Sequence, residues 1–201
     1  MITWLQEQIW LKKSKPIPAH MSFFHCFGGL SVCIILLLFA TGLFMLFFYE
    51  PEPLEALKSI EYMSNEVALG GFFRNIHRWS SVILLAMVFS HMTIVFYLKA
   101  YRSPREFSWL TGVVQLLVVS LFISTGIVLP WDWRSYWSFS IWVDYIESWP
   151  LIGEFLSQII LDRFSFSIGY FTHILILPIT LAVLLHFHFK MVRKHGISEP
   201  L

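Results

Sequence analysis

The sequence predicts an all-α membrane protein, in which a bundle of four transmembrane helices follows an N-terminal interfacial helix. Two observations lead to this fold class. First, 57% of the 201 residues are hydrophobic and only 13% are charged, whereas about a quarter of the residues in a soluble domain are charged. Second, the apolar residues are gathered into four long stretches that contain no charged side chain.

Each of these stretches contains at least 20 residues, and they cover residues 27–49, 79–98, 109–130 and 164–189. About 20 helical residues cross the hydrocarbon core of a bilayer. A helix is required because an isolated strand would leave its backbone groups unpaired in lipid. We therefore expect four membrane-spanning helices in a single membrane domain, residues 1–201.

The segments outside these stretches indicate shorter helices. Residues 1–20 are amphipathic and have no small-residue cleavage site, which favours an interfacial helix over a signal peptide. The long connection 131–163 is rich in tryptophan and acidic residues. Because tryptophan is enriched at membrane–water interfaces, we expect short interfacial helices in this connection as well.

Charged residues divide between the two ends of the predicted bundle. Ten of the 13 acidic residues lie in the first and third connections. Nine basic residues lie at the opposite end: Lys12, Lys13, Lys15, Lys99, Arg102, Arg105, Lys190, Arg193 and Lys194. Because cytoplasmic loops are enriched in Lys and Arg, both termini are expected on the cytoplasmic, negative side. The same residues therefore read as topology signals and do not support nucleic-acid binding.

Two of the apolar stretches contain histidines, which are costly in a membrane span and need partners there. His77 and His91 are fourteen residues apart, so a helix places them on nearly one face and ~21 Å apart. In the last stretch, His188 is rotated by ~60° from His173 and His186 by ~140°. His188 is therefore the better same-face partner of His173.

Two antiparallel helices with two inward histidines each form two pairs across the bundle. The expected pairs are His77 with His173 near the acidic side and His91 with His188 near the basic side. Neutral imidazole is a common axial ligand of haem iron, and bundle cores are places where such cofactors bind. The pattern therefore predicts a di-haem bundle that holds two haems b by bis-histidine ligation.

Other interpretations of four histidines fit less well. Hydrogen-bonded helix contacts would explain one membrane histidine more readily than four in matched pairs. A zinc site or a proton path also uses histidine, but gaps of four helical turns are too long for the ligands of one metal ion.

The two apolar stretches without haem-ligand candidates contain glycines at the same period. Gly28 and Gly42 are fourteen residues apart, and so are Gly112 and Gly126. Glycine lets a large group approach the backbone closely, whereas packing of small residues between helices favours a separation of four. The glycines therefore predict that two flat rings pass these helices at two levels.

Arginines stand where haem propionates would need them. Arg74 and Arg78 bracket His77, while Arg105 and Arg193 lie at the other end of the predicted bundle. Guanidinium groups suit carboxylates geometrically. Each arginine could equally serve as a snorkelling or topology charge.

These residues lie in stretches that resemble the cytochrome b family of quinol oxidoreductases, in its short, split, four-helix form of the cytochrome b6 type. The matching stretches are FHCFGG, ATG, RNIHRWSS, SPREFSWLTGVV, STGIVLPWD and HFKMVRKHGISEPL, which cover nearly the whole chain in order. The family's four haem ligands match His77, His91, His173 and His188, so the resemblance implies the same ligands as the helical geometry.

The resemblance also implies the reaction, a Q cycle in an energy-transducing membrane. Quinol is oxidised at the positive side, where one electron passes to a Rieske iron–sulfur protein and the other to the haems. The second electron crosses the membrane and reduces quinone at the negative side. The chain would then be the electron-transfer subunit of a homodimeric quinol:cytochrome c or plastocyanin-type reductase, with a c-type cytochrome as a further partner.

Only the family resemblance indicates a function for Cys26. By pattern, a lone cysteine at a helix start is a packing residue, and the CxxCH signature of c-type haem attachment is absent. In the split form, however, the cysteine of the matching stretch holds a third haem, of c type, through one thioether beside the negative-side haem b. The resemblance therefore implies a covalent haem at Cys26.

Three features depart from the family pattern. The chain ends after the fourth stretch, so the Pro-Glu-Trp-Tyr motif of the quinol site is expected on a separate subunit that carries the remaining helices. No arginine stands five residues before His173, which removes one expected propionate partner. The stretch LPWDWRSYW adds charge and bulk where the iron–sulfur protein would dock.

Two alternative functions stay open at this point. A haem-b membrane anchor could exchange electrons between quinone and another redox enzyme without a Rieske partner, and the subunits that copurify would distinguish it. A haem-free transporter could use the histidines to relay protons. The visible spectrum of the purified protein would distinguish it, because such a transporter has no haem absorption.

Overall fold

The computed structural model describes residues 23–163 and 166–196, most of which are helical. A 3-10 helix, η1 (Phe23–Cys26), leads into α2 (Phe27–Leu46), which is followed by α3 (Ala56–Asn65), α4 (Gly70–Tyr97) and α5 (Glu106–Val128). Then come α6 (Trp133–Glu147), α7 (Gly153–Arg163), α8 (Phe166–Phe171), the π-helical segment η2 (Thr172–Ile176) and α9 (Leu177–His195). The predicted interfacial helix, residues 1–20, lies outside the described residues.

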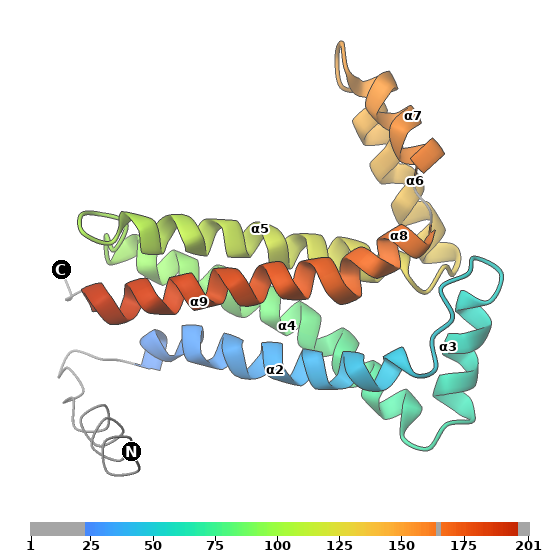
Figure 1. The fold of residues 1–201 in the computed structure, drawn as a ribbon, viewed down its shortest axis with the longest axis horizontal. Coiled ribbons are helices and arrows are strands. Elements are labelled where there is room, and N and C mark those ends of the chain that lie inside the picture. Colours follow the sequence, from blue (N-terminus) through green and yellow to red (C-terminus); the bar gives the residue numbers. More distant parts are fainter. Residues whose placement is uncertain (1–22, 164–165, 197–201) are drawn as a thin grey trace, which may run out of the picture.

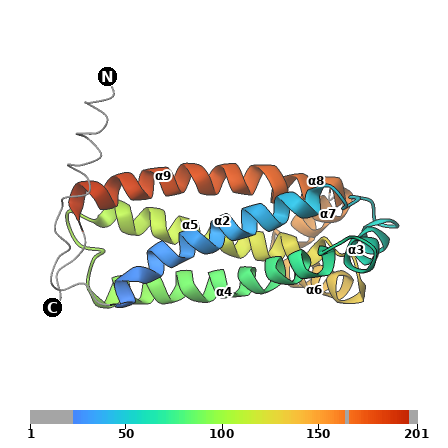
Figure 2. The ribbon, with the colours of Figure 1, turned by 90° about the horizontal axis from the view of Figure 1, so that it is seen from below.

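Four helices are long and apolar enough to span a membrane: α2, α4, α5 and the helical run Ile168–His195 that ends with α9. They lie side by side along one direction, with α2 packed on α4, and α5 packed on both α4 and α9 (Figures 1 and 2). The start of α2, the α4–α5 turn and the end of α9 share one end of the bundle, and α3, α6 and α7 lie at the other. The predicted fold class, an all-α membrane bundle with four spanning helices, is confirmed.

The bundle distributes its side chains differently from a soluble protein. Large apolar side chains face outward, among them Leu36, Phe39 and Phe89, each more than 60% exposed. In a membrane, such an apolar surface is in contact with lipid. Several of the most buried side chains are instead polar, including Thr41 at 2% and Gln115 at 9% exposed. Polar groups therefore lie inside the bundle, where a polar or ionisable residue in a membrane protein usually has a function.

The start of α4 is set by its contact with α3. A methyl group at Gly70 would collide with the carbonyl oxygen of Met63, and one at Gly71 would lie 3.0 Å from the carbonyl oxygen of Ser64. Because glycine lacks that carbon, the two backbones meet closely and α4 starts at Gly70. The helix is thus longer than the apolar stretch 79–98, and its first two turns extend beyond that stretch.

The last spanning helix contains an irregular turn. Residues Thr172–Ile176 form a π-helical segment, η2, between α8 and α9. Pro178 lies two residues after this segment and lacks the N–H that a regular helix would bond to the carbonyl four residues earlier. A π-helical turn accommodates one additional residue, so it changes the rotation of His173 relative to the rest of α9.

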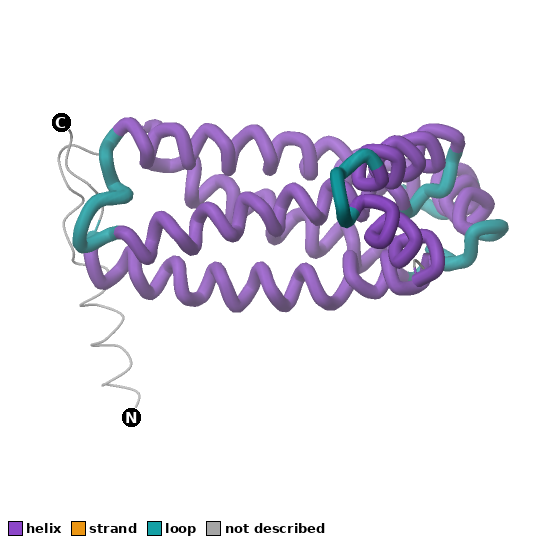
Figure 3. Tube along the Cα trace, turned by 90° about the horizontal axis from the view of Figure 1, so that it is seen from above, coloured by secondary structure: helices purple, strands orange, loops and turns teal. Residues whose placement is uncertain are grey.

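Helices α6 and α7 pack against each other and project sideways from one end of the bundle, across the direction of the spanning helices (Figures 1 and 3). Asp132 caps the start of α6, since its Oδ1 accepts hydrogen bonds from the backbone N–H of Ser135 (2.8 Å) and from its hydroxyl (2.9 Å). Burial alone would raise the pKa of Asp132, but these hydrogen bonds hold it below its ordinary value. The carboxylate is therefore well suited to stay charged as a cap.

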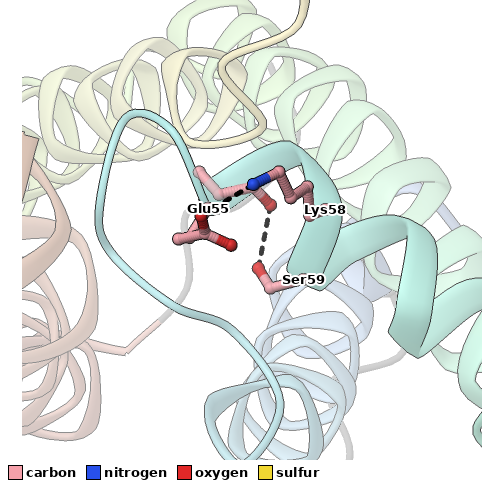
Figure 4. Close-up of polar contacts among 4 residues, drawn as sticks. Glu55, Lys58 and Ser59 are labelled. Atoms are coloured by element: carbon pink, nitrogen blue, oxygen red, sulfur yellow. Dashed lines mark hydrogen bonds and ion pairs between the residues drawn. The ribbon is translucent and has the colours of Figure 1, made fainter.

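At the same end, polar contacts stabilise the start of α3 (Figure 4). Lys58 Nζ lies 2.8 Å from Glu55 Oε1, and the hydroxyl of Ser59 donates to the carbonyl of Ala56 at 2.8 Å. The same hydroxyl accepts from the backbone N–H of Glu50 at 3.2 Å, which connects the α2–α3 loop to the helix. These contacts hold α3 against the end of the bundle.

Candidate functional site

Four imidazoles lie half-buried in the bundle at two levels. His77 and His91 come from α4, His173 comes from η2 and His188 comes from α9. His173 lies close enough to His77 for an electrostatic interaction, and His188 lies close enough to His91. The structure thus brings together the two pairs expected from the sequence. His186, two residues before His188, is exposed.

The two histidines of α4 lie against glycines of α2. A methyl carbon at Gly42 would lie 3.2 Å from Cε1 of His77, and one at Gly28 would lie 3.0 Å from Cε1 of His91. Both distances are shorter than ordinary van der Waals contact. The absence of a side chain at these glycines is therefore what allows the imidazoles to occupy their positions.

The other two histidines lie against glycines of α5 in the same way. A methyl carbon at Gly126 would lie 3.0 Å from Cε1 of His173, and one at Gly112 would lie 3.7 Å from Cε1 of His188. His173 also meets the ring of Phe122 edge-on, with 5.4 Å between the ring centroids. All four glycines chosen by their fourteen-residue period thus contact the four histidines of the two pairs.

Three of the imidazoles form hydrogen bonds with threonines. The three contacts are Thr41 Oγ1 with His77 Nδ1 at 2.9 Å, Thr125 Oγ1 with His173 Nδ1 at 2.8 Å, and Thr111 Oγ1 with His188 Nδ1 at 2.9 Å. Each threonine directly precedes one of the glycines. We did not predict a role for these threonines from the sequence, although the repeated Thr-Gly dipeptide was the available signal.

The hydroxyl protons decide which nitrogen of each ring carries hydrogen. Thr41 Oγ1 lies 2.9 Å from the carbonyl of Leu37, and Thr125 Oγ1 lies 2.8 Å from that of Leu121. A hydroxyl has a single proton, and each threonine donates it to one of these carbonyls in a hydrogen bond. Toward the imidazole, Oγ1 therefore acts as an acceptor, and Nδ1–H is the donor. In a neutral imidazole with hydrogen on Nδ1, Nε2 keeps a lone pair for a metal.

These features fit haem better than a bare metal ion. Paired imidazoles are suitable axial ligands of haem iron, and the four glycines let these imidazoles approach the backbones of α2 and α5 closely. Within residues 23–163 and 166–196, no group of three or more His, Cys, Asp or Glu residues could hold one metal ion. The four histidines therefore do not converge on a single zinc-type site.

The predicted propionate partners lie at the ends of the bundle. Arg74 is half-buried one turn before His77, with its Nη1 3.5 Å from Ser64 Oγ, and Arg78 is exposed. At the opposite end, Arg193 is exposed and its Nε donates to the carbonyl of Phe189 at 3.3 Å. Their positions leave these guanidinium groups available for a carboxylate at either end.

Cys26 lies at the end of the bundle where His91 and His188 form their pair. It is exposed, it precedes the first residue of α2, and it stands two residues before Gly28. Cys33 lies further along α2 and is also exposed. The exposed thiol of Cys26 has space around it for a bulky substituent.

Comparison with known proteins is consistent with this geometry. The family described as Cytochrome b/b6/petB matches residues 12–196. Cytochrome b6 of Prochlorothrix hollandica is 38% identical over 195 residues, which cover 94% of this chain and 87% of the relative. Cytochrome b6 of Mastigocladus laminosus is 36% identical over 211 aligned residues, which cover 98% and 97%.

A solved structure described as a hyperthermophilic respiratory complex III contains a similar chain. The two superpose with a TM-score of 0.88 at 26% sequence identity. The match covers 100% of the present chain and 56% of the solved one. The present chain therefore spans about half the length of that structural relative.

Proposed function

The chain belongs to the cytochrome b family, and on this premise we propose that it is the haem-bearing electron-transfer subunit of a quinol oxidoreductase that operates a Q cycle. The observation that carries the proposal is the arrangement of four imidazoles in two facing pairs inside a membrane bundle, each against a glycine. When bound, two haems b supply one-electron transfer between the two faces of the membrane.

The residues of this chain have distinct parts in such a site. His77 and His173 would hold one haem, and His91 and His188 the other. For the three rings that bond to a threonine, Nε2 would be the ligand atom, because their Nδ1 is engaged by the threonine. Gly28, Gly42, Gly112 and Gly126 would leave room for the two rings. Arg74 and Arg78 at one end, and Arg193 at the other, would bind the propionates.

Spectroscopy of the purified complex tests the proposal. We expect the visible spectrum of two six-coordinate b-type haems per chain, and we expect quinol to reduce them. A colourless preparation would favour the haem-free proton transporter and overturn the proposal. Copurification of an iron–sulfur subunit would distinguish the reductase from a haem-b anchor that serves another redox enzyme.

The remaining partners are proposed from the family. From the resemblance to the split form of the family, we propose that a separate subunit carries the rest of the cytochrome b helices and the Pro-Glu-Trp-Tyr motif. A Rieske iron–sulfur protein would take one electron from quinol and pass it to a c-type cytochrome. The complete assembly would be a homodimer. Subunit identification in the purified complex tests each of these partners.

The orientation in the membrane follows from charge. Basic residues gather in the α4–α5 turn and at the end of α9, and acidic residues gather in the connections at the other end. We place the basic end on the cytoplasmic, negative side. A reporter tag after Leu201 should therefore be accessible from that side only, and a tag within residues 131–163 from the opposite side. The reverse result would also reverse the direction of electron flow.

We further propose that Cys26 carries a third haem, of c type, through one thioether. After denaturing electrophoresis, the chain should retain haem peroxidase staining, and its mass should exceed the 23.6 kDa of the polypeptide by one haem. Cys26→Ser should lose both signals. Cys33→Ser is the matched control, because Cys33 is exposed on the same helix, and it should keep both. Staining that survives Cys26→Ser would place the attachment elsewhere.

A further inference from the structure

Gln115 is a polar side chain buried in the membrane-spanning part of the bundle, where it is 9% exposed. Its surroundings on α5 and α9 are apolar, because Val118, Leu177 and Leu181 form a buried cluster against which Leu184 also packs. A polar group in such a place is costly unless it forms a hydrogen bond. In a membrane span, a residue of this kind usually has a function.

The amide of Gln115 bonds to α9 one turn before a proposed haem ligand. Gln115 Nε2 donates to the carbonyl of Leu184 at 3.3 Å. In an α-helix, a carbonyl also accepts the backbone N–H of the residue four positions later. For Leu184 in α9, that residue is His188. Gln115 therefore bonds to the same carbonyl that holds the backbone of His188.

The same face of α5 also holds the ring of His188. Thr111 precedes Gln115 by four residues, about one helical turn, and its Oγ1 lies 2.9 Å from His188 Nδ1. The helix α5 thus fixes one residue of α9 at two points. Thr111 fixes the ring, and Gln115 fixes the backbone that carries the ring.

The other three positions of this kind lack an amide. Gln115 stands three residues after Gly112, and the residues at the same offset after the other three glycines are Ser31, Met45 and Leu129. The hydroxyl of Ser31 donates to a carbonyl of its own helix, and methionine and leucine side chains have no N–H to donate. Among these four positions, a side-chain amide bond to the facing helix is therefore particular to Gln115.

We infer that Gln115 is a positioning residue that keeps His188 bound as an axial ligand. The inference rests on the proposed function. A haem with two histidine ligands has no open position, so carbon monoxide binds to the reduced iron only while one histidine is dissociated. Displacement of His188 from the iron requires its ring or its backbone to move away from α5. The bond from Gln115 opposes that movement and lowers the population of the dissociated state.

Titration of the reduced, purified complex with carbon monoxide tests this role. Gln115→Met keeps the approximate length of the side chain and removes the donor. We expect it to raise the apparent affinity for carbon monoxide about three- to tenfold, the effect of losing one hydrogen bond of this kind. The apparent affinity follows the population of the binding-competent state. Gln115→Asn, whose amide is one methylene shorter, should have the same effect and replaces Gln115→Met if that variant does not assemble.

Single-haem variants identify the haem that is affected. In His77→Ala, the remaining haem is expected to be the one held by His91 and His188, and addition of Gln115→Met should again raise the affinity for carbon monoxide. In His91→Ala, the remaining haem is expected to be the other one, and Gln115→Met should have no effect. An equal effect in both backgrounds would contradict the assignment to His188.

Two further variants on α5 separate positioning from a general loss of stability. Val118→Ala removes buried apolar atoms from the neighbouring cluster, and it should lower the unfolding temperature without changing the affinity for carbon monoxide. Ser120→Ala removes an exposed hydroxyl that bonds to the carbonyl of Leu116, and it should change neither quantity. An affinity in Gln115→Met that equals the wild-type value, or that Val118→Ala reproduces, would overturn the inference. Absence of haem from the wild-type protein would instead overturn the proposed function.

Discussion

Replacing His77 or His173 by alanine is expected to remove one haem b, and replacing His91 or His188 is expected to remove the other. The two rings of each pair lie close together across the bundle, and a haem with one of its two axial ligands missing loses its main attachment. Each variant should therefore contain one haem b where the wild type contains two. The ratio of haem to polypeptide, measured by absorbance, reports the loss directly.

The pattern across the four variants carries more information than any single one. His77→Ala and His173→Ala should remove the same redox component, and His91→Ala and His188→Ala the other. His186→Ala is the matched control, because that ring is exposed on the same helix, two residues from His188. If His186→Ala lost a haem and His188→Ala kept it, the assignment of the ligand on α9 would be wrong.

The second large effect is expected from Gly126→Val. The first side-chain carbon at this position would lie 3.0 Å from Cε1 of His173, inside van der Waals contact, and the additional methyl groups would enlarge the conflict. Overpacking of this kind costs about 1–3 kcal/mol, and here the strain acts directly on a proposed ligand. We expect loss of the haem held by His77 and His173, together with a lower thermal unfolding temperature.

Gly29 offers a control on the other glycine-bearing helix. A methyl carbon there would meet nothing within 4 Å, so Gly29→Val should keep both haems. Gly112→Ala should be better tolerated than Gly126→Ala, because its new carbon would lie 3.7 Å from His188, at ordinary contact distance. Equal haem loss in Gly29→Val and Gly126→Val would indicate that helix destabilisation, and not contact with the imidazole, is the cause.

Much of this arrangement could be predicted from the sequence. The four spanning helices follow from uncharged length, because hydrophobic thickness is the dominant constraint in a bilayer. The inward direction of His77 and His91 follows from their fourteen-residue separation. The angle of helical rotation from His173 distinguished His188, which bonds to Thr111, from His186, which is exposed.

Other features depend on contacts that no single segment reveals. A threonine in a membrane helix usually bonds to the carbonyl four residues earlier, as Thr41 does, so its second contact with His77 becomes evident only when α2 and α4 are placed together. The start of α4 at Gly70 depends on the approach of α3. The π-helical turn at His173 could not be recognised from apolar periodicity, which is nearly the same in α- and π-helices over five residues.

The order of glycines and histidines along the chain gives the bundle an internal symmetry. The hairpin of α2 and α4 presents Gly28, Gly42, His77 and His91 in that order, and the hairpin of α5 and α9, with η2, presents Gly112, Gly126, His173 and His188 in the same order. The two halves thus repeat the same order of glycines and histidines along two pairs of spanning helices.

Each haem would take one ligand from either half. Neither hairpin alone could complete a bis-histidine site, but two copies of one hairpin could complete both. The smallest haem-binding ancestor compatible with this architecture is therefore a homodimer of a two-helix chain. Fusion of its two copies would then have allowed the halves to diverge. Phe27, which precedes Gly28, differs in this way from the threonines that precede the other three glycines.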